Sequence, residues 1–205
     1  MIQIYYNNLW GGIADNFYSG NGSHEKNIVK PFIREVSLFL ASFEQPISVC
    51  DLGCGDFSIG KELVSNSSSY NAIDIVPRLI ERNKSIFKDN NLEFHCLDIS
   101  SDVLPKGDCA IVRQVLQHLS NAEVHFIVRK LRDFKYVVLT EHIPNGKFTA
   151  NKDIISGQGI RIKHHSGIDL LKPPFNFEVE TATTLLTVPL GNNKGVISTI
   201  LYRVF

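Results

Sequence analysis

The stretch Val49–Gly60, VCDLGCGDFSIG, decides how the rest of the chain is interpreted. It joins an apolar run to an acid, Asp51, and then to glycines, of which Gly53 and Gly55 are separated by a single residue. Glycine lets a backbone turn tightly and approach a ligand, and a helix that begins after such a turn presents free N–H groups. The stretch predicts either a plain strand-to-helix turn or a ligand-binding loop at the carboxyl end of a strand, where open α/β sheets bind ligands.

Apolar runs with strand character alternate with helical patterns through most of the chain, which is typical of an α/β protein with a parallel sheet. We expect strands at 47–53, 70–75, 92–99, 108–114 and 136–141. We expect helices at Asn27–Phe43, Ile59–Ser65, Pro77–Lys88 and Asn121–Leu131. Ser120 and Glu123 form a capping box for the last helix, and Pro31 is expected to begin or kink the first.

The alternation of strands and helices stops after residue 144. The stretch 145–182 is rich in Gly, Pro, Lys and His, and within it IRIKH alternates in a way that favours a strand with a basic face. Two β-rich runs then flank the turn GNNKG, which favours a hairpin. The expected fold is a single α/β domain, a doubly wound, mostly parallel sheet with a C-terminal antiparallel hairpin.

Composition argues against several classes of function. The 205 residues carry 21 basic and 21 acidic side chains, so the broad positive charge of a nucleic-acid binder is missing. No membrane span is evident and the N-terminus lacks a secretory signal, so we expect a cytoplasmic protein. The four cysteines include no C-x-x-C pair, so we expect small buried residues and no metal site. The oligomeric state is not predicted.

Two further acids lie at the ends of predicted strands. Asp74 ends the second strand, at about the spacing where a carboxylate receives ribose hydroxyls in nucleotide-binding α/β folds, and Asp98 ends the third. Because three successive strands deliver an acid to the same edge of the sheet, we expect Asp51, Asp74 and Asp98 to converge on one ligand.

The ordered motifs VCDLGCGDFSIG, AIDIVP, CLDIS and IVRQVLQHLSN resemble those of class I S-adenosylmethionine-dependent methyltransferases, over about Ile47–Pro144. The resemblance implies a Rossmann-like fold, S-adenosylmethionine as cofactor, and methyltransferase activity. Asp51, Gly53 and Gly55 match the acid and the Gly-x-Gly of the first motif. The third glycine position of the family is Phe57 in this chain, so the loop is expected to be less open.

The resemblance also implies roles for individual residues. Asp74 matches the acid that grips both ribose hydroxyls, and Asp98 and Ile99 match the pair that lines the adenine. The implied cofactor-binding residues are Asp51, Gly53, Cys54, Gly55, Asp74, Ile75, Asp98, Ile99, Arg113 and Gln114. An aromatic N-terminal segment is expected to cover the cofactor with Trp10, Phe17 and Tyr18. The expected divisions are 1–45 (cover and first helix), 46–144 (cofactor-binding core), 145–182 (acceptor-binding insertion) and 183–205 (hairpin).

Two alternative functions remain open. A nicotinamide-dependent oxidoreductase also uses glycines after the first strand and an acid after the second, but its pyrophosphate favours a third glycine, where this chain has Ser58. Asp51 would place negative charge near those phosphates, whereas it suits the cationic amino group and sulfonium of S-adenosylmethionine. The second alternative is a catalytically inactive module that binds the cofactor or a protein.

Acceptor chemistry is expected beyond the cofactor motifs. Methyl transfer mostly requires positioning, and an imidazole suits proton removal, so His142 and His118 are the candidate catalytic residues. Arg161, Lys163 and His165 are candidate substrate-binding residues, because cations pair with anionic or hydroxyl-rich acceptors. A solvated edge strand guarded by charge is the alternative for this basic cluster. The charge balance favours a small-molecule or glycan acceptor, with O-methylation as the expected reaction.

Overall fold

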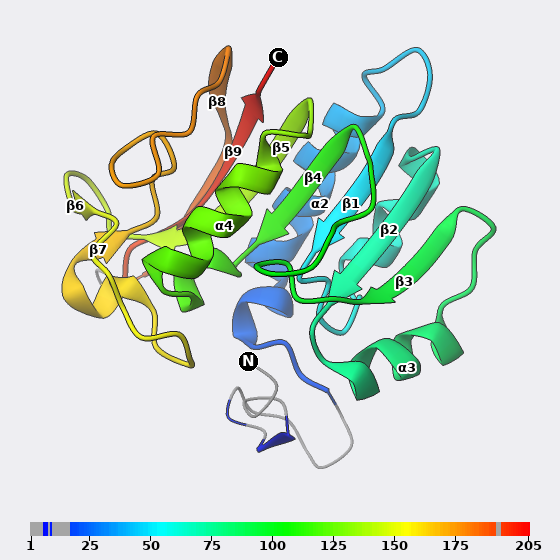
Figure 1. Ribbon diagram of the computed structural model, residues 1–205, viewed down its shortest axis with the longest axis horizontal. Coiled ribbons are helices and arrows are strands. Elements are labelled where there is room, and N and C mark those ends of the chain that lie inside the picture. Colours follow the sequence, from blue (N-terminus) through cyan, green and yellow to red (C-terminus); the bar gives the residue numbers. More distant parts are fainter. Residues whose placement is uncertain (1–5, 8, 10–16, 192–193) are drawn as a thin grey trace.

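The computed structural model describes residues 6–7, 9, 17–191 and 194–205, and its main element is a seven-stranded sheet in the order β3-β2-β1-β4-β5-β9-β8 (Figure 1). The parallel strands are β1 (Ser48–Leu52), β2 (Ser69–Asp74), β3 (Leu92–Cys96), β4 (Cys109–Arg113) and β5 (Tyr136–Ile143). β9 (Val196–Arg203) pairs antiparallel with both β5 and β8 (Thr181–Pro189). The predicted fold class, a mostly parallel sheet with a C-terminal antiparallel hairpin, is confirmed.

Helices cover both faces of this sheet. Figure 1 shows α4 (Asn121–Leu131) in front of the sheet and α2 (Lys26–Leu40) behind it, with α3 (Pro77–Ile86) near the edge strand β3. Each of the two main helices buries one apolar stripe at helical spacing. The stripe of α4 is Val124, Ile127, Val128 and Leu131, and that of α2 is Ile28, Phe32, Val36 and Leu40. The α4 stripe and the α2 residues Phe32, Val36 and Leu40 pack into separate clusters, so the core has two layers.

Local capping signals predict the start of two of the three α-helices that the structure describes. Ser120 accepts a hydrogen bond from the backbone N–H of Glu123, whose carboxylate accepts from the Ser120 N–H at 3.1 Å, so α4 begins where the capping box predicts. Pro77 is the first residue of α3. The prediction for Pro31 is wrong in one respect, because α2 begins five residues earlier, at Lys26, and contains Pro31 in its interior.

The predicted helix at Ile59–Ser65 is wrong. Two short 3-10 helices, η2 (Gly60–Glu62) and η3 (Val64–Asn66), take its place. The segment is short and runs into a series of Ser and Asn residues, which compete with helix formation by bonding to nearby backbone groups. The Ser67 hydroxyl, for example, donates to the Val64 carbonyl at 2.8 Å. The connection from β1 to β2 is therefore a chain of tight turns.

The predicted strand at IRIKH is also wrong. These residues form the 3-10 helix η5 (Arg161–His164), which ends at His165 in the left-handed region (φ 50°). The alternation of apolar and basic residues does not reflect a solvated edge, because the Arg161 side chain points inward and is 1% exposed. Two short strands flank η5 and pair in parallel: β6 (Thr149–Ala150) and β7 (Ser166–Gly167).

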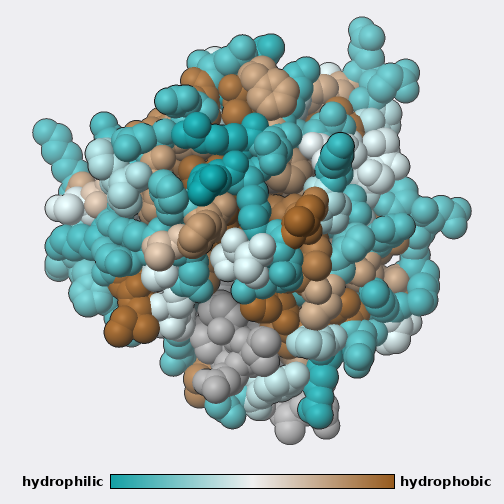
Figure 2. Space-filling view, in the orientation of Figure 1, coloured by the Kyte–Doolittle hydropathy of each residue, from teal (hydrophilic) through white to brown (hydrophobic). Residues whose placement is uncertain are grey.

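The surface on the α4 side is mostly hydrophilic, with hydrophobic side chains scattered over it in small groups (Figure 2). Within the described ranges, the helices all fall short of the length and apolar character needed to cross a membrane.

Candidate active site

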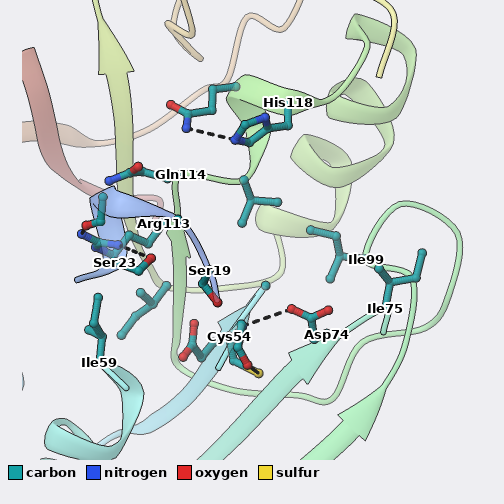
Figure 3. A pocket seen from close by; sticks show the side chains of 18 of the residues that line it. Ser19, Ser23, Cys54, Ile59, Asp74, Ile75, Ile99, Arg113, Gln114 and His118 are labelled. Atoms are coloured by element: carbon teal, nitrogen blue, oxygen red, sulfur yellow. Dashed lines mark hydrogen bonds between the residues drawn. The ribbon is translucent and has the colours of Figure 1, made fainter. Parts of the chain in front are cut away.

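A cavity of about 470 Å³ lies at the carboxyl ends of β1, β2 and β4. Figure 3 shows Cys54, Asp74, Ile99, Arg113 and His118 arranged around it. Every residue that the sequence proposes for cofactor binding lines this cavity: Asp51, Gly53, Cys54, Gly55, Asp74, Ile75, Asp98, Ile99, Arg113 and Gln114. The fold therefore brings together residues from four successive strand ends that are far apart in the chain.

The loop after β1 is held against the end of β2 by backbone hydrogen bonds. The N–H groups of Gly53 and Cys54 both donate to the Ile73 carbonyl, at 2.8 and 2.9 Å. Gly53 has φ +91°, and a Cβ at this position would lie 2.4 Å from Cγ2 of Val115. Glycine is required here for both reasons, because the backbone is left-handed and the turn after β4 packs directly on it.

Asp74 ends β2 and orders the loop opposite it. Its Oδ2 accepts the Gly55 N–H at 3.1 Å, and its Oδ1 accepts the Val76 N–H at 3.1 Å. Burial raises the pKa of Asp74 to about 6, although these backbone hydrogen bonds work in the opposite direction. The carboxylate is thus fixed by its backbone partners and keeps acceptor capacity for donors within the cavity.

Asp51, the last but one residue of β1, is a second buried carboxylate in the cavity. Its Oδ2 accepts the Tyr70 hydroxyl at 3.0 Å. Burial raises the pKa of Asp51 to about 7, the Tyr70 hydrogen bond lowers it, and the nearby charges of Asp74 and Arg113 have smaller opposing effects. Among the described residues, no Lys, Arg or His forms an ion pair with Asp51 or Asp74. A ligand with a positive charge would compensate this buried negative charge.

Asp98 lies just beyond β3 rather than at its last residue. Its Oδ1 accepts the backbone N–H and the hydroxyl of Ser100, at 2.8 and 2.7 Å, which ends the strand in a tight turn. The strand is therefore shorter than the predicted 92–99, although Asp98 still lines the cavity. Ile75 and Ile99 line the same part of the cavity and give it an apolar wall next to a carboxylate.

Arg113 and Gln114, at the end of β4, add buried polar groups on the opposite side. Arg113 Nη2 donates to the Gly22 carbonyl at 2.6 Å, Nη1 donates to the Ser23 hydroxyl at 3.3 Å, and the guanidinium lies 5.0 Å from the centre of the Phe32 ring. Burial lowers the pKa of Arg113 to about 10, so the side chain stays cationic at neutral pH. Within the described part of the chain, Arg113 Nε and Gln114 Nε2 are buried without a hydrogen-bond partner.

The segment before α2 closes one side of the cavity. Ser19, Gly20, Gly22 and Ser23 line it. Asp56 anchors this segment: its Oδ2 contacts His24 Nε2 at 2.8 Å, and its N–H donates to the Ser19 hydroxyl at 2.9 Å. The Tyr18 ring stacks on His24 with 4.4 Å between centroids. Phe17 and Tyr18, which were expected to cover the cofactor, precede this segment and do not line the cavity, and Trp10 lies outside the described residues.

Both candidate catalytic histidines line the cavity, in different surroundings. Burial lowers the pKa of His118 to about 4, and its Nδ1 lies 3.2 Å from the Gly157 carbonyl oxygen. His118 is therefore a neutral imidazole with Nδ1 as the protonated nitrogen, which leaves the lone pair on Nε2. His142 is half-buried, and its Nε2 lies 2.5 Å from the Lys194 carbonyl oxygen. Burial lowers the pKa of His142 as well.

The three candidate substrate-binding residues are separated in the structure. Lys163 lines the cavity with an exposed side chain. His165 is exposed and does not line it. Arg161 is buried away from the cavity and donates to backbone carbonyls and to one side-chain amide. The expectation of a shared basic face is therefore corrected, because Arg161 bonds inward while its neighbours face solvent.

Two residues that the sequence did not single out, Glu141 and Gln117, connect β5 with the turn after β4. Glu141, in β5, is 2% exposed, and its carboxylate accepts the N–H groups of Leu116 and Gln117 at 3.0 and 2.9 Å. Gln117 Oε1 accepts the His142 N–H at 2.9 Å, and its Nε2 lies 3.3 Å from His118 Nε2. An acid in the apolar run YVVLTEHI was the available signal, since a buried acid requires partners.

Comparison with known proteins places this fold. No family model matches the chain. The malonyl-[acyl-carrier protein] O-methyltransferase of Acetivibrio thermocellus is 26% identical over 140 residues, which cover 53% of this chain and 49% of that protein. The match thus spans about half the length of this curated relative.

Solved methyltransferases share the architecture at low identity. The N-methyltransferase NodS from Bradyrhizobium japonicum, in complex with S-adenosyl-L-homocysteine, aligns with a TM-score of 0.70 and 13% identity, over 99% of this chain and 97% of that one. Human N-acetylserotonin methyltransferase in complex with S-adenosylmethionine aligns with a TM-score of 0.54 and 16% identity, over 97% of this chain and 61% of that one. The chain therefore has the Rossmann-like fold of the class I S-adenosylmethionine-dependent methyltransferases.

Proposed function

We propose that this chain is an S-adenosylmethionine-dependent methyltransferase that acts on a small-molecule or glycan acceptor. The observation that carries the proposal is the pair of buried carboxylates, Asp51 and Asp74, in one cavity at the strand ends. Neither has an ion-pair partner among the described residues, although both are nearly fully buried. A ligand that brings hydroxyl donors and a positive charge would satisfy both.

The residues that line the cavity fit S-adenosylmethionine in chemical character. Asp74 offers acceptors for the ribose hydroxyls, and Asp98 with the two isoleucines offers an acceptor and an apolar wall for the adenine. Asp51 suits the amino group of the methionine part. The Arg113 Nε and Gln114 Nε2 groups, buried without a partner in the described chain, suit its carboxylate. When bound, S-adenosylmethionine supplies a methyl group on a positively charged sulfur.

The chain itself would then position an acceptor and exclude water. The covering segment Ser19–Ser23 and the segment 156–163 enclose the cavity on two sides. His118 Nε2, which lies 3.3 Å from Gln117 Nε2, is our candidate for a hydrogen bond to the acceptor, since a pKa of about 4 makes the ring a weak base. His142 is the second candidate, and Lys163 is the candidate contact for an anionic group at the cavity mouth.

The choice of acceptor class rests on the balance of charge. With 21 basic and 21 acidic side chains, the chain lacks the broad positive charge that favours a nucleic-acid acceptor. We propose O-methylation because the curated relative is named as an O-methyltransferase. NodS is named as an N-methyltransferase, so N-methylation is the competing outcome.

A nicotinamide-dependent oxidoreductase fits the site less well. Dinucleotide-binding folds seat the pyrophosphate at the N-terminus of the helix after the first strand. In this chain that position holds the short turns η2 and η3. The carboxylates of Asp51, Asp56 and Asp74 also line this part of the cavity and would repel phosphates. An inactive module that only binds S-adenosylmethionine remains the second candidate, since the same carboxylates would serve it equally.

The test is incubation of the protein with S-adenosylmethionine labelled in the methyl group and a cell extract, followed by mass spectrometry of the products. We expect labelled product with the wild type and strongly reduced label with Asp74→Asn. Binding of S-adenosylhomocysteine without transfer to any component would favour the inactive module. Absence of binding would refute the proposed cofactor.

A further inference from the structure

The turn that presents His118 to the cavity is held by a buried acid. This turn is η4 (Leu116–His118), between β4 and α4. The Glu141 carboxylate accepts the N–H of Leu116 with Oε1 and the N–H of Gln117 with Oε2, at 3.0 and 2.9 Å. These are N–H groups at the start of a 3-10 helix, which have no partner within the helix.

The carbonyl groups at the same turn accept hydrogen bonds from a buried cation, the guanidinium of Arg161. Arg161 Nη1 donates to the Leu116 carbonyl at 2.9 Å, and Nη2 donates to the Leu119 carbonyl at 2.7 Å. Nη2 also donates to Asn121 Oδ1 at 2.8 Å, and Nε donates to the Lys152 carbonyl at 3.0 Å. The guanidinium therefore joins η4, the start of α4 and the segment after β6 with one rigid group.

We propose that Glu141 and Arg161 are positioning residues that fix the η4 turn, and with it His118 and Gln117, on the acceptor side of the cavity. This inference rests on the proposed methyltransferase function for its purpose, but the arrangement itself can be tested without a methyl donor. Arg161 thus acts through the turn. It does not line the cavity, so it does not make the acceptor contact that the sequence predicts for it.

Three observations favour this role over a general contribution to folding. A hydrogen-bond acceptor, Glu141, and a hydrogen-bond donor, Arg161, lie at opposite groups of one turn only a few residues long. The side chains are 2% and 1% exposed, so water does not substitute for them. The turn carries two cavity-lining side chains in succession, Gln117 and His118, which are also joined to each other and to the His142 backbone.

The position of His118 can be followed by its own titration. Burial holds the pKa of His118 at about 4 against an ordinary 6.5, so a ring that swings into solvent would titrate near 6.5. We would record ¹⁵N NMR spectra of the histidine ring nitrogens between about pH 2.5 and pH 8, in protein without cofactor. His118→Gln identifies the His118 signals.

Glu141→Gln and Arg161→Lys are the informative variants, because they separate position from charge. Burial raises the pKa of Glu141 to about 8, so this side chain is largely protonated where His118 titrates, and Glu141→Gln alters its hydrogen bonds with little change of charge. A loosened turn exposes the His118 ring and raises its pKa. Arg161→Lys keeps the positive charge but loses the planar fork of donors. We expect both variants to raise the pKa of His118 by about one pH unit or more. The matched controls are Glu180→Gln and Arg203→Lys, which alter an ion pair of 2.9 Å with 52% exposure on each side.

The proposal is overturned if Glu141→Gln lowers the pKa of His118, or if both variants melt earlier while the His118 titration stays as in the wild type. Should neither variant fold, Asn121→Ala removes one acceptor of Arg161 Nη2 and is judged by the same criterion on a smaller scale. Binding of S-adenosylhomocysteine is measured separately by calorimetry. Its absence in the wild type would refute the proposed function and leave the result for the turn unchanged.

Discussion

Replacing Asp74 by asparagine removes a negative charge from the cavity and leaves the shape of the side chain nearly unchanged. The two carboxylate oxygens each accept one backbone N–H, from Gly55 and Val76, both at 3.1 Å. A carboxylate has about four acceptor positions, so about two remain for donors on a ligand. Asparagine keeps a single acceptor oxygen, so at least one hydrogen bond to the ligand is lost.

The size of the effect on binding follows from this count. A hydrogen bond to a charged group contributes about 1.5–3 kcal/mol, and about 1.4 kcal/mol corresponds to a factor of ten in affinity. We therefore expect Asp74→Asn to raise the Kd for S-adenosylhomocysteine by about ten- to a hundredfold.

The fold should survive the same substitution, because two effects on stability offset each other. Burial raises the pKa of Asp74 from 3.8 to about 6. Because one pKa unit corresponds to about 1.4 kcal/mol, keeping Asp74 ionised at neutral pH costs the folded state about 3 kcal/mol. The neutral amide avoids this cost, while a backbone N–H left without an acceptor costs about 1–3 kcal/mol.

Titration calorimetry with S-adenosylhomocysteine measures the affinity, and thermal denaturation checks the fold. Asp133→Asn is the matched control, since Asp133 is an exposed acid in the turn after α4. An unchanged Kd in an Asp74→Asn protein that melts like the wild type would remove Asp74 from the binding site and refute the reasoning.

Other changes test other parts of the site. Because the pKa of Asp51 is raised from 3.8 to about 7, the folded chain binds more protons than the unfolded chain in that window. The contribution of Asp51 to the free energy of unfolding is present below about pH 4 and lost as the pH rises through about 7. Asp51→Asn should remove this decline in the free energy of unfolding, measured by urea denaturation at several pH values. A decline with pH as steep as in the wild type would contradict the prediction. Phe57→Ala should lower the free energy of unfolding by about 3–5 kcal/mol, because the buried ring packs on three other aromatic rings; a smaller loss would mean that the site collapses around the alanine. Gly53→Ala places a Cβ 2.4 Å from Val115 at φ +91° and should weaken S-adenosylhomocysteine binding, whereas Gly159→Ala, with open space around it, should not; equal affinities would show that the loop tolerates a side chain.

Local signals made much of the fold predictable. The capping box at Ser120 and Glu123 marks the start of α4, and Pro77 marks the start of α3, because both act within a single turn of helix. The strand ends at Asp51 and Asp74 were predictable because the carboxyl ends of parallel strands meet at one edge of the sheet. The cavity-lining positions of these acids follow from topology alone.

The remaining features depend on contacts between distant segments. Arg161 is buried by carbonyl groups of Leu116 and Leu119, more than 40 residues earlier, and a basic residue in an alternating run gives no sign of this. The covering segment is held by Asp56 through Ser19 and His24, across more than 30 residues. Such pairings are determined by tertiary packing, so neither periodicity nor capping reveals them.

Thermal denaturation with S-adenosylhomocysteine and with NAD, each in a separate experiment, tests the central claim that this cavity binds the methyl donor. A ligand at about 100 times its Kd stabilises a protein by about 2.7 kcal/mol, or about 5–10 °C for a chain of this length. We predict an increase of this size with S-adenosylhomocysteine and no increase with NAD. Stabilisation by NAD, with no response to S-adenosylhomocysteine, would contradict the account.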